Sequence, residues 1–194
     1  MAIREVLQIG DPRLKRANAP VTDFNDPRLA QVIQDLVDTM RAGGSVGFAA
    51  PQIGENWQLL ATEFLETASR PRERSDALRI YINPILRGAS EEVVEIWEAC
   101  RSVANATLYA PVVRPKVVTV EAADVEGKRF RLTADGILGR VVQHEFDHLV
   151  GVEFLEKVTD LKRFMSRESY QTLIKSRPDV QTASATTVKS VEPA

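Results

Sequence analysis

Apolar residues recur at helical spacing in the first clear element of the chain, residues 27–42. The apolar positions that share one helical face are Leu29, Ile33, Leu36, Val37 and Met40. Asp26 is a favourable N-cap, Pro27 suits the first helical position, and Gly43 is typical of a helix end. The pattern therefore predicts an amphipathic helix that packs one face on a core.

Shorter apolar runs bounded by turn residues predict the strands. These runs cover residues 57–64, 81–86, 92–97, 116–123 and 128–133. The last two flank Asp124-Val125-Glu126-Gly127, which is a strong hairpin signal. A second helix is predicted over residues 135–149, with Gly151 as its stop, and a shorter third helix over residues 160–175.

Other segments have no periodic pattern. Residues 1–25 are expected to form an irregular arm, and residues 66–79 are charged and poor in large apolar side chains, which favours a surface loop or flap. Residues 176–194 lack aromatic side chains and are rich in Ser, Thr, Ala and Val, so we expect a disordered tail. Residues 1–175 are then expected to form a single domain.

Composition excludes several classes of protein. A net charge of −2 and a pI of about 5.8 give no electrostatic reason to expect nucleic acid or an anionic membrane as a partner. The sequence has no apolar run of about 18 residues, so no membrane span is expected. With one cysteine the chain cannot form an internal disulfide, and its first residues lack the apolar core of a signal peptide. We therefore expect a cytoplasmic protein.

The chain has two histidines and one cysteine, and a metal site would account for all three. His144 and His148 are four residues apart on the predicted second helix, so both imidazoles project from one face. Glu145 follows His144 and would lie beside a metal rather than on it, where a general base belongs. Such a pair also arises by chance on amphipathic helices, so the pattern alone is a moderate signal.

A catalytic zinc-type site usually has a third protein ligand, and the spacing leaves its identity open. Six residues after His148, where one class of zinc peptidases has a third histidine, the chain has Phe154. Glu168 is a downstream candidate of the type used by thermolysin-like peptidases. Cys100 is the upstream candidate, although an isolated cysteine is more often a small buried apolar residue.

Three stretches resemble, in order and spacing, the signature motifs of peptide deformylases: Gly47-Phe48-Ala49-Ala50-Pro51-Gln52, Glu98-Ala99-Cys100-Arg101-Ser102 and Gln143-His144-Glu145-Phe146-Asp147-His148-Leu149. The resemblance implies an α+β fold with mixed and antiparallel strands packed around the metal-binding helix. It also implies a hydrolase that removes the formyl group from the N-terminal formyl-methionine of new polypeptides. Nascent formyl-methionyl peptides would be its substrates, with transient contact with the ribosome left open.

The resemblance also assigns roles to residues. Cys100, His144 and His148 would bind one divalent metal, typically ferrous iron, with zinc, nickel or cobalt able to replace it. Glu145 would take a proton from water and return it to the leaving amine. The Gln52 side-chain amide and the backbone N–H of Arg101 would stabilise the negative charge that develops on the formyl oxygen.

A hydrophobic pocket for the methionine side chain is expected at Val46, Gly47, Ile96 and Val141, although apolar residues near a site are more often plain core. Among the neighbours of the motifs, Glu98 is expected to act in a structural or outer-shell role. Asp147 should face away from the metal, and we hypothesise that it forms a buried ion pair with Arg114.

The chain departs from the commonest bacterial pattern at Ser45, Ala99 and Arg101. The stretch that follows, Ser102-Val103-Ala104, together with Arg140, is more similar to the mitochondrial-type sequences. Arg101 places a cation at the edge of the site, where it would affect peptide preference. Two rival interpretations remain: a deformylase-like binding protein without activity, and a zinc-type peptidase that uses Glu168 in place of Cys100.

Overall fold

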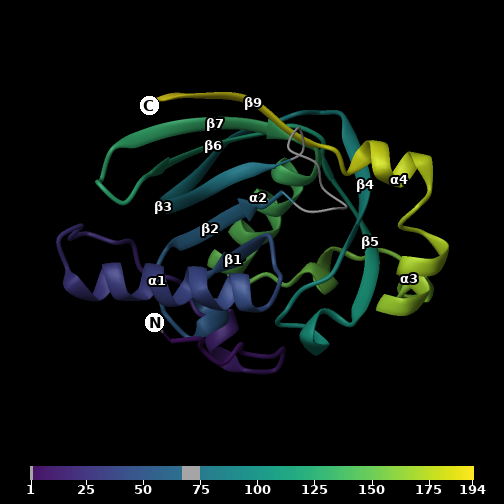
Figure 1. Ribbon diagram of the computed structural model, residues 1–194, viewed down its shortest axis with the longest axis horizontal. Helices are drawn as coiled ribbons and strands as arrows, with labels where there is room; N and C mark the ends of the chain where they lie inside the picture. Colours follow the sequence, from purple (N-terminus) through teal and green to yellow (C-terminus); the bar gives the residue numbers. More distant parts are fainter. Residues whose placement is uncertain (1, 67–74) are drawn as a thin grey trace.

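The computed structural model describes residues 2–66 and 75–194, and for residues 186–188 the backbone alone. Two antiparallel sheets form its framework (Figure 1). The larger has the order β1-β2-β3-β6-β7-β9, whose strands are Gly47–Ala49, Leu59–Phe64, Asp76–Ala89, Val118–Ala123, Arg129–Asp135 and Thr186–Pro193. The smaller has the order β4-β5-β8, with strands Val93–Glu98, Leu108–Pro115 and Met165–Ser166.

In the described residues, four α-helices accompany the sheets: α1 Pro27–Ala42, α2 Gly136–Leu149, α3 Arg167–Leu173 and α4 Pro178–Ala183. Short 3-10 turns occur at η1 Pro12–Lys15, η2 Ala50–Ile53, η4 Ala104–Ala106, η5 Phe154–Lys157 and η6 Leu161–Arg163. Within the described residues, no helix combines the length and the apolar character that a membrane crossing requires. The fold is α+β, as expected, with antiparallel strands around α2 (Figure 1).

The two long helices pack on opposite faces of the larger sheet. Leu59 and Ala61 on β2 join the cluster that α1 buries, whereas Leu60, between them, joins the cluster that α2 buries. Because successive strand residues point to opposite faces, every residue of β2 is buried. The larger sheet is therefore covered on both faces, and α2 lies in the centre of the molecule (Figure 1).

Local sequence determines where α1 begins and how closely α2 packs on the sheet. The Asp26 side chain caps α1 by accepting a hydrogen bond from the backbone N–H of Arg28 (2.8 Å). At the start of α2, a Cβ atom on Gly139 would lie 2.8 Å from the carbonyl oxygen of Ala134. A larger residue at 139 would push α2 away from β7, so this glycine sets the distance between the metal-binding helix and the sheet.

The structure confirms α1 and α2, and the predicted strands correspond to β2, β3, β4, β6 and β7. The predicted helix over residues 160–175 is wrong over its first half, because α3 begins only at Arg167. In the expected 66–79 loop, residues 67–74 lie outside the described residues, and Asp76 to Arg79 belong to β3. Strands β1 and β5 were not predicted.

The expected disorder of residues 176–194 is wrong. This segment forms α4 and then β9, which pairs with β7 from Phe130↔Pro193 to Asp135↔Thr187. The Thr- and Val-rich composition that indicated disorder also favours strands, and β7 offers it an unpaired edge. The tail therefore completes the larger sheet (Figure 1).

Candidate metal centre and its cavity

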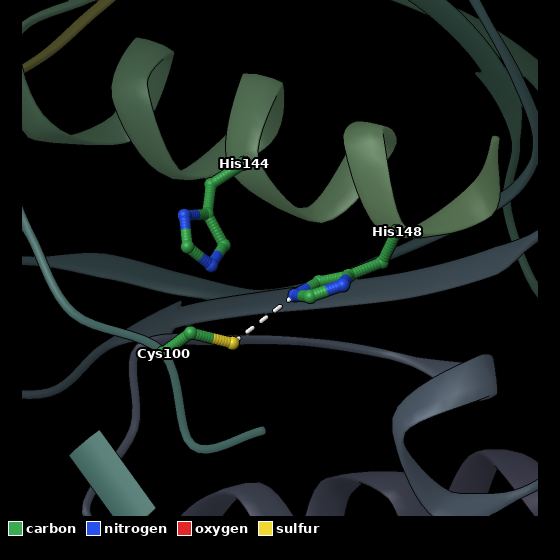
Figure 2. A group of neighbouring side chains, drawn as sticks. All are labelled: Cys100, His144 and His148. Carbon is green, nitrogen blue, oxygen red and sulfur yellow. Dashed lines mark hydrogen bonds between the residues drawn. The ribbon is translucent and has the colours of Figure 1, made fainter. Parts of the chain in front are cut away.

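Cys100, His144 and His148 converge on one point in the interior. One potential ligand atom from each side chain lies within 4.8 Å of the others, and all three residues are buried. Figure 2 shows both imidazoles projecting from α2 toward the thiol, with the Cys100 Sγ 3.2 Å from the His148 Nε2. Two imidazoles and a thiolate form a donor set that suits zinc or ferrous iron.

The other candidates for a third ligand lie elsewhere. Phe154 is buried and its ring stacks on His144 with centroids 6.0 Å apart, so it packs the site from the side. Glu168 is an exposed residue in the first turn of α3 and is not part of the cluster. The cysteine that follows β4 is therefore the residue that completes the set.

Glu98 orients the first histidine. Its Oε2 lies 2.8 Å from the His144 Nδ1, which leaves the Nε2 of that ring free to face the cluster. The same carboxylate accepts hydrogen bonds from Arg114 and Arg140. Burial opposes ionisation of Glu98, but the hydrogen bonds with His144 and Arg114 outweigh it and hold its pKa far below the usual range. The expectation of an outer-shell role for Glu98 agrees with these contacts.

A second acidic group lies behind the other histidine. The Glu153 Oε2 is 3.5 Å from the Nδ1 of His148, and both side chains are buried. Nearby, Arg114 contacts Asp147 as well as Glu98, which confirms the hypothesised buried ion pair. The ion pair of Arg114 with Asp147 links β5 to α2.

Glu145 lies between the two histidines in the sequence, and it borders the cavity. It is buried, and among the described residues its Oε2 has no hydrogen-bond partner. Burial raises its pKa to about 7, although His144 and His148 oppose this rise. A carboxyl group with such a pKa can accept and release a proton near neutral pH.

Gly47 allows β1 to approach α2 closely. A Cβ at this position would lie 2.3 Å from the Cγ1 of Val141 and 3.0 Å from the Oε1 of Glu145. No other residue type fits without moving the helix or the strand. The absence of a side chain keeps the space next to Glu145 open.

The Gln52 amide has a fixed orientation. Its Oε1 accepts a hydrogen bond from the backbone N–H of Ala49 (2.8 Å), so its Nε2 points toward the cluster. There it lies 3.5 Å from the Cys100 Sγ and 3.3 Å from the Ser102 Oγ. Sequence reasoning gave Ser102 no role, although the residue ends the second motif and its backbone N–H also contacts the Cys100 sulfur (3.4 Å).

A cavity of about 380 Å³ opens onto the cluster. Val46, Gly47 and Val141 line it together with Glu145, as expected. Ile96 was expected as well, but it is absent from the lining, because it is buried on the inner face of β4 while Trp97 next to it reaches the cavity. Sequence reasoning missed a further part of the wall, which comes from distant segments: Trp97, Tyr109, Ile137, Arg167 and Gln171.

The charge state of the cluster fits the binding of a cation. Burial alone would raise the pKa of Cys100, but His148 and His144 lower it to about 6. Burial alone would lower the pKa of His144, and its bonds with Cys100 and Glu98 raise it to about 10. The thiolate is already in the form that binds a metal ion, and the charged imidazoles would release their protons when the metal binds. The residues present therefore fit a divalent metal.

Comparison with known proteins agrees with this geometry. The sequence matches the family profile of polypeptide deformylase over residues 3–164. It is 37% identical to peptide deformylase 1 of Bordetella pertussis over 162 residues, which is 84% of this chain and 91% of that protein.

Solved structures are similar as well. The class I type b peptide deformylase of Acinetobacter baumannii bound to Met-Ala-Ser has a TM-score of 0.75 at 28% identity, over 81% of this chain and 99% of that one. The peptide deformylase of Ehrlichia chaffeensis has a TM-score of 0.74 at 29% identity, over 84% and 91% of the two chains. The chain therefore belongs to the peptide deformylase family.

Proposed function

We propose that this peptide deformylase carries out its reaction at the cavity above Cys100, His144 and His148, with these three side chains holding one divalent metal. The observation that supports this most directly is that Cys100 and His144 of the buried three-residue cluster line the cavity together with Glu145, whose Oε2 has no hydrogen-bond partner among the described residues. The substrate is a peptide with an N-terminal formyl-methionine, and the products are formate and the free amino terminus.

Glu145 acts as the proton carrier. The metal, when bound, supplies Lewis-acid activation of water and of the formyl carbonyl. The Glu145 carboxylate accepts a proton from the attacking water and delivers it to the amide nitrogen as the C–N bond breaks. Its raised pKa, near 7, suits both halves of this transfer. Its burial beside the cluster keeps bulk water from competing for the proton.

Gln52 and the backbone N–H of Arg101 stabilise the charge that develops on the formyl oxygen. The Gln52 amide supports this role because Ala49 holds its oxygen and leaves the NH₂ group directed at the cluster. A donor that is already oriented needs no reorganisation during the reaction, and such a donor typically contributes about two to three orders of magnitude in rate.

The methionine side chain binds between Val46 and Val141, and the peptide backbone passes Gly47. Two observations support this placement. Among the described strands, β1 is at the edge of its sheet and pairs with β2 alone, so an extended peptide can lie along it. The Acinetobacter relative was solved with the tripeptide Met-Ala-Ser bound.

Ferrous iron is the native metal that we propose, with zinc, nickel and cobalt as replacements. A donor set of one thiolate and two imidazoles accepts each of these ions, and the affinity order alone does not select among them. Exposure to oxygen should inactivate an iron-loaded site and spare a nickel-loaded one.

The deciding experiment measures deformylation of a short formyl-methionyl peptide by protein purified without oxygen, with the metal content determined on the same sample. Turnover in proportion to one metal per chain supports the proposal. One metal per chain without turnover would instead favour a binding protein that has lost activity. The peptidase interpretation loses its support because Glu168 lies outside the cluster.

A further inference from the structure

Two arginines of the cavity wall have no acidic partner in the part of the chain that the structure describes. Arg101, which follows the cluster cysteine, and Arg167, at the start of α3, both line the cavity. Neither guanidinium forms an ion pair with any carboxylate among residues 2–66 and 75–194. Arg140, which also lines the cavity, differs from them, because it forms an ion pair with Glu98.

The two guanidinium groups are held side by side by the η4 turn. The carbonyl oxygen of Asn105 accepts hydrogen bonds from the Arg101 Nη1 (3.5 Å) and from the Arg167 Nη2 (3.2 Å). The Ala106 carbonyl binds Arg167 through its Nη2 (2.7 Å) and its Nε (3.1 Å). One backbone oxygen is therefore shared by two cations that belong to distant parts of the sequence.

The turn that makes this contact is strained. Ala104, Asn105 and Ala106 have φ angles of 47°, 52° and 59°, in the left-handed region that side chains other than glycine rarely adopt. Three such residues in succession persist only where the surrounding structure requires them. Here they direct the carbonyls of Asn105 and Ala106 at the two arginines.

Arg101 also has unused hydrogen-bonding capacity. Its Nε is buried and has no acceptor in the described part of the chain. The same atom would lie 3.3 Å from a Cβ on Gly43, so the side chain extends from the cysteine toward the turn after α1. Two adjacent like charges, one with a buried unpartnered donor, are costly unless an anion joins them.

We propose that Arg101 and Arg167 together bind the side-chain carboxylate of an acidic residue, Asp or Glu, that follows the formyl-methionine of the substrate. This rests on the proposed function, in which the formyl group lies at the metal cluster and the peptide runs along the cavity. Guanidinium groups match a carboxylate in shape and charge, and their charge-assisted hydrogen bonds are the stronger kind. The overall charge of −2 gives no reason to expect a polyanion such as RNA.

The test compares kcat/KM for peptides that differ in one side chain: formyl-Met-Ala-Ser, formyl-Met-Asp-Ser and formyl-Met-Ala-Asp, all with amidated carboxyl ends. We expect kcat/KM for the better acidic peptide to exceed that for the neutral peptide by about tenfold or more, mainly through a lower KM. The reason is that hydrogen bonds to charged groups are stronger than those between neutral groups. Added salt should reduce this ratio.

Variants locate the effect. Arg101→Gln and Arg167→Gln should each bring the ratio of acidic to neutral peptide toward one. Arg167→Lys should restore part of the preference. The matched control is Arg16→Gln, which removes the same charge at an exposed position that does not line the cavity and should leave the ratio unchanged.

A ratio near one in the unaltered enzyme, or a preference that survives both Gln variants, overturns the inference. If the ratio is near one and an RNA oligonucleotide inhibits the unaltered enzyme but neither Gln variant, the two arginines bind RNA and the inference is overturned. Absence of turnover with formyl-Met-Ala-Ser overturns the proposed function instead. In that case the same peptide ratio, measured as Kd by calorimetry, still decides whether the two arginines bind a carboxylate.

Discussion

At the scale of single residues, Glu145 is the most direct test of the chemistry. Glu145→Gln keeps the size of the side chain but cannot carry a proton. We expect turnover of a formyl-methionyl peptide to fall by about two to four orders of magnitude. The metal content should remain at one per chain, because Glu145 is not in the ligand cluster. Substantial activity with full metal content would remove Glu145 from the proton-carrier role.

Glu98 provides a second test at this scale, because one carboxylate neutralises Arg114 and Arg140 and orients His144. Glu98→Gln leaves the buried Arg140 without a counter-charge and leaves Arg114 with Asp147 alone. We expect the free energy of unfolding to fall by about 3–5 kcal/mol, as measured by urea denaturation. Metal affinity, measured by chelator competition, should fall by about 10- to 100-fold.

Glu95→Gln is the matched control for this change. Glu95 lies on the same strand, and its ion pair with Arg163 is exposed at both ends. Exposed pairs contribute little, so we expect a loss of about 0–1 kcal/mol and unchanged metal affinity. Equal losses in the two variants would show that Glu98 has no special role in supporting the metal site.

At the scale of elements, the contact between β1 and α2 depends on Gly47. In Gly47→Ala the new methyl group would collide with Val141, which a packed interior does not absorb easily. We expect a loss of about 1–3 kcal/mol in unfolding free energy, together with a higher KM. Gly88→Ala, also on a strand, meets its nearest atom at 3.9 Å and should change stability by less than about 0.5 kcal/mol.

Glu121 joins three strands through charge. Its carboxylate binds Arg87 from β3 and Arg131 from β7, and hydrogen bonds from Arg131 and Arg87 lower its pKa to about 2. Because this pKa is lowered in the folded state, ionised Glu121 stabilises the fold. The stabilisation is complete at pH values above the usual glutamate pKa, near 4.5, and is lost as pH falls toward 2. Melting temperature should therefore fall with pH over this range.

Glu121→Gln should melt at a lower temperature at pH 7 and show a weaker dependence on pH between about 4.5 and 3. The control is Glu126→Gln, at the hairpin turn, which forms no ion pair within the described chain. It should retain the pH dependence of the unaltered protein. An unchanged slope in the Glu121 variant would show that other carboxylates control acid unfolding.

The elements differ in how far the sequence determines them. Helices α1 and α2 were predictable because caps and apolar spacing agree, and the three motifs located Cys100, His144 and His148 in one site. Strand β5 was missed because Pro111 and Arg114 interrupt its apolar pattern, although its pairing with β4 buries that arginine against Glu98. Contacts with a partner strand and a buried counter-charge override local propensity there.

The cavity wall was less predictable than the cluster. Ile96 and Trp97 are both apolar, and only the register of β4 decides which of them faces the cavity. Arg167 comes from a segment with no motif, and its position next to Arg101 depends on the turn at Asn105. Such contacts between distant segments have no signature in a single sequence.

At the scale of the whole molecule, β9 shows how a segment beyond the family match completes the fold. The profile match ends at residue 164, whereas β9 spans Thr186–Pro193 and covers the edge of β7. Without it, β7 would present unpaired N–H and C=O groups at the edge of the remaining five-stranded sheet, a template for association with other chains. The tail should therefore contribute to stability and to resistance against aggregation more than to chemistry.

Deletion of residues 186–194 tests this division. We expect a lower melting temperature and faster aggregation on light scattering, because the freed edge of β7 can pair with another copy. The ligands Cys100, His144 and His148 do not belong to the deleted segment, so freshly purified protein should keep one metal per chain. Lys189→Gln, which removes only the ion pair with Asp135, is the control and should behave like the unaltered chain. Loss of metal on deletion, without aggregation, would mean that β9 supports the site through α2, whose Ile137 N–H bonds the Ala185 carbonyl next to the deletion.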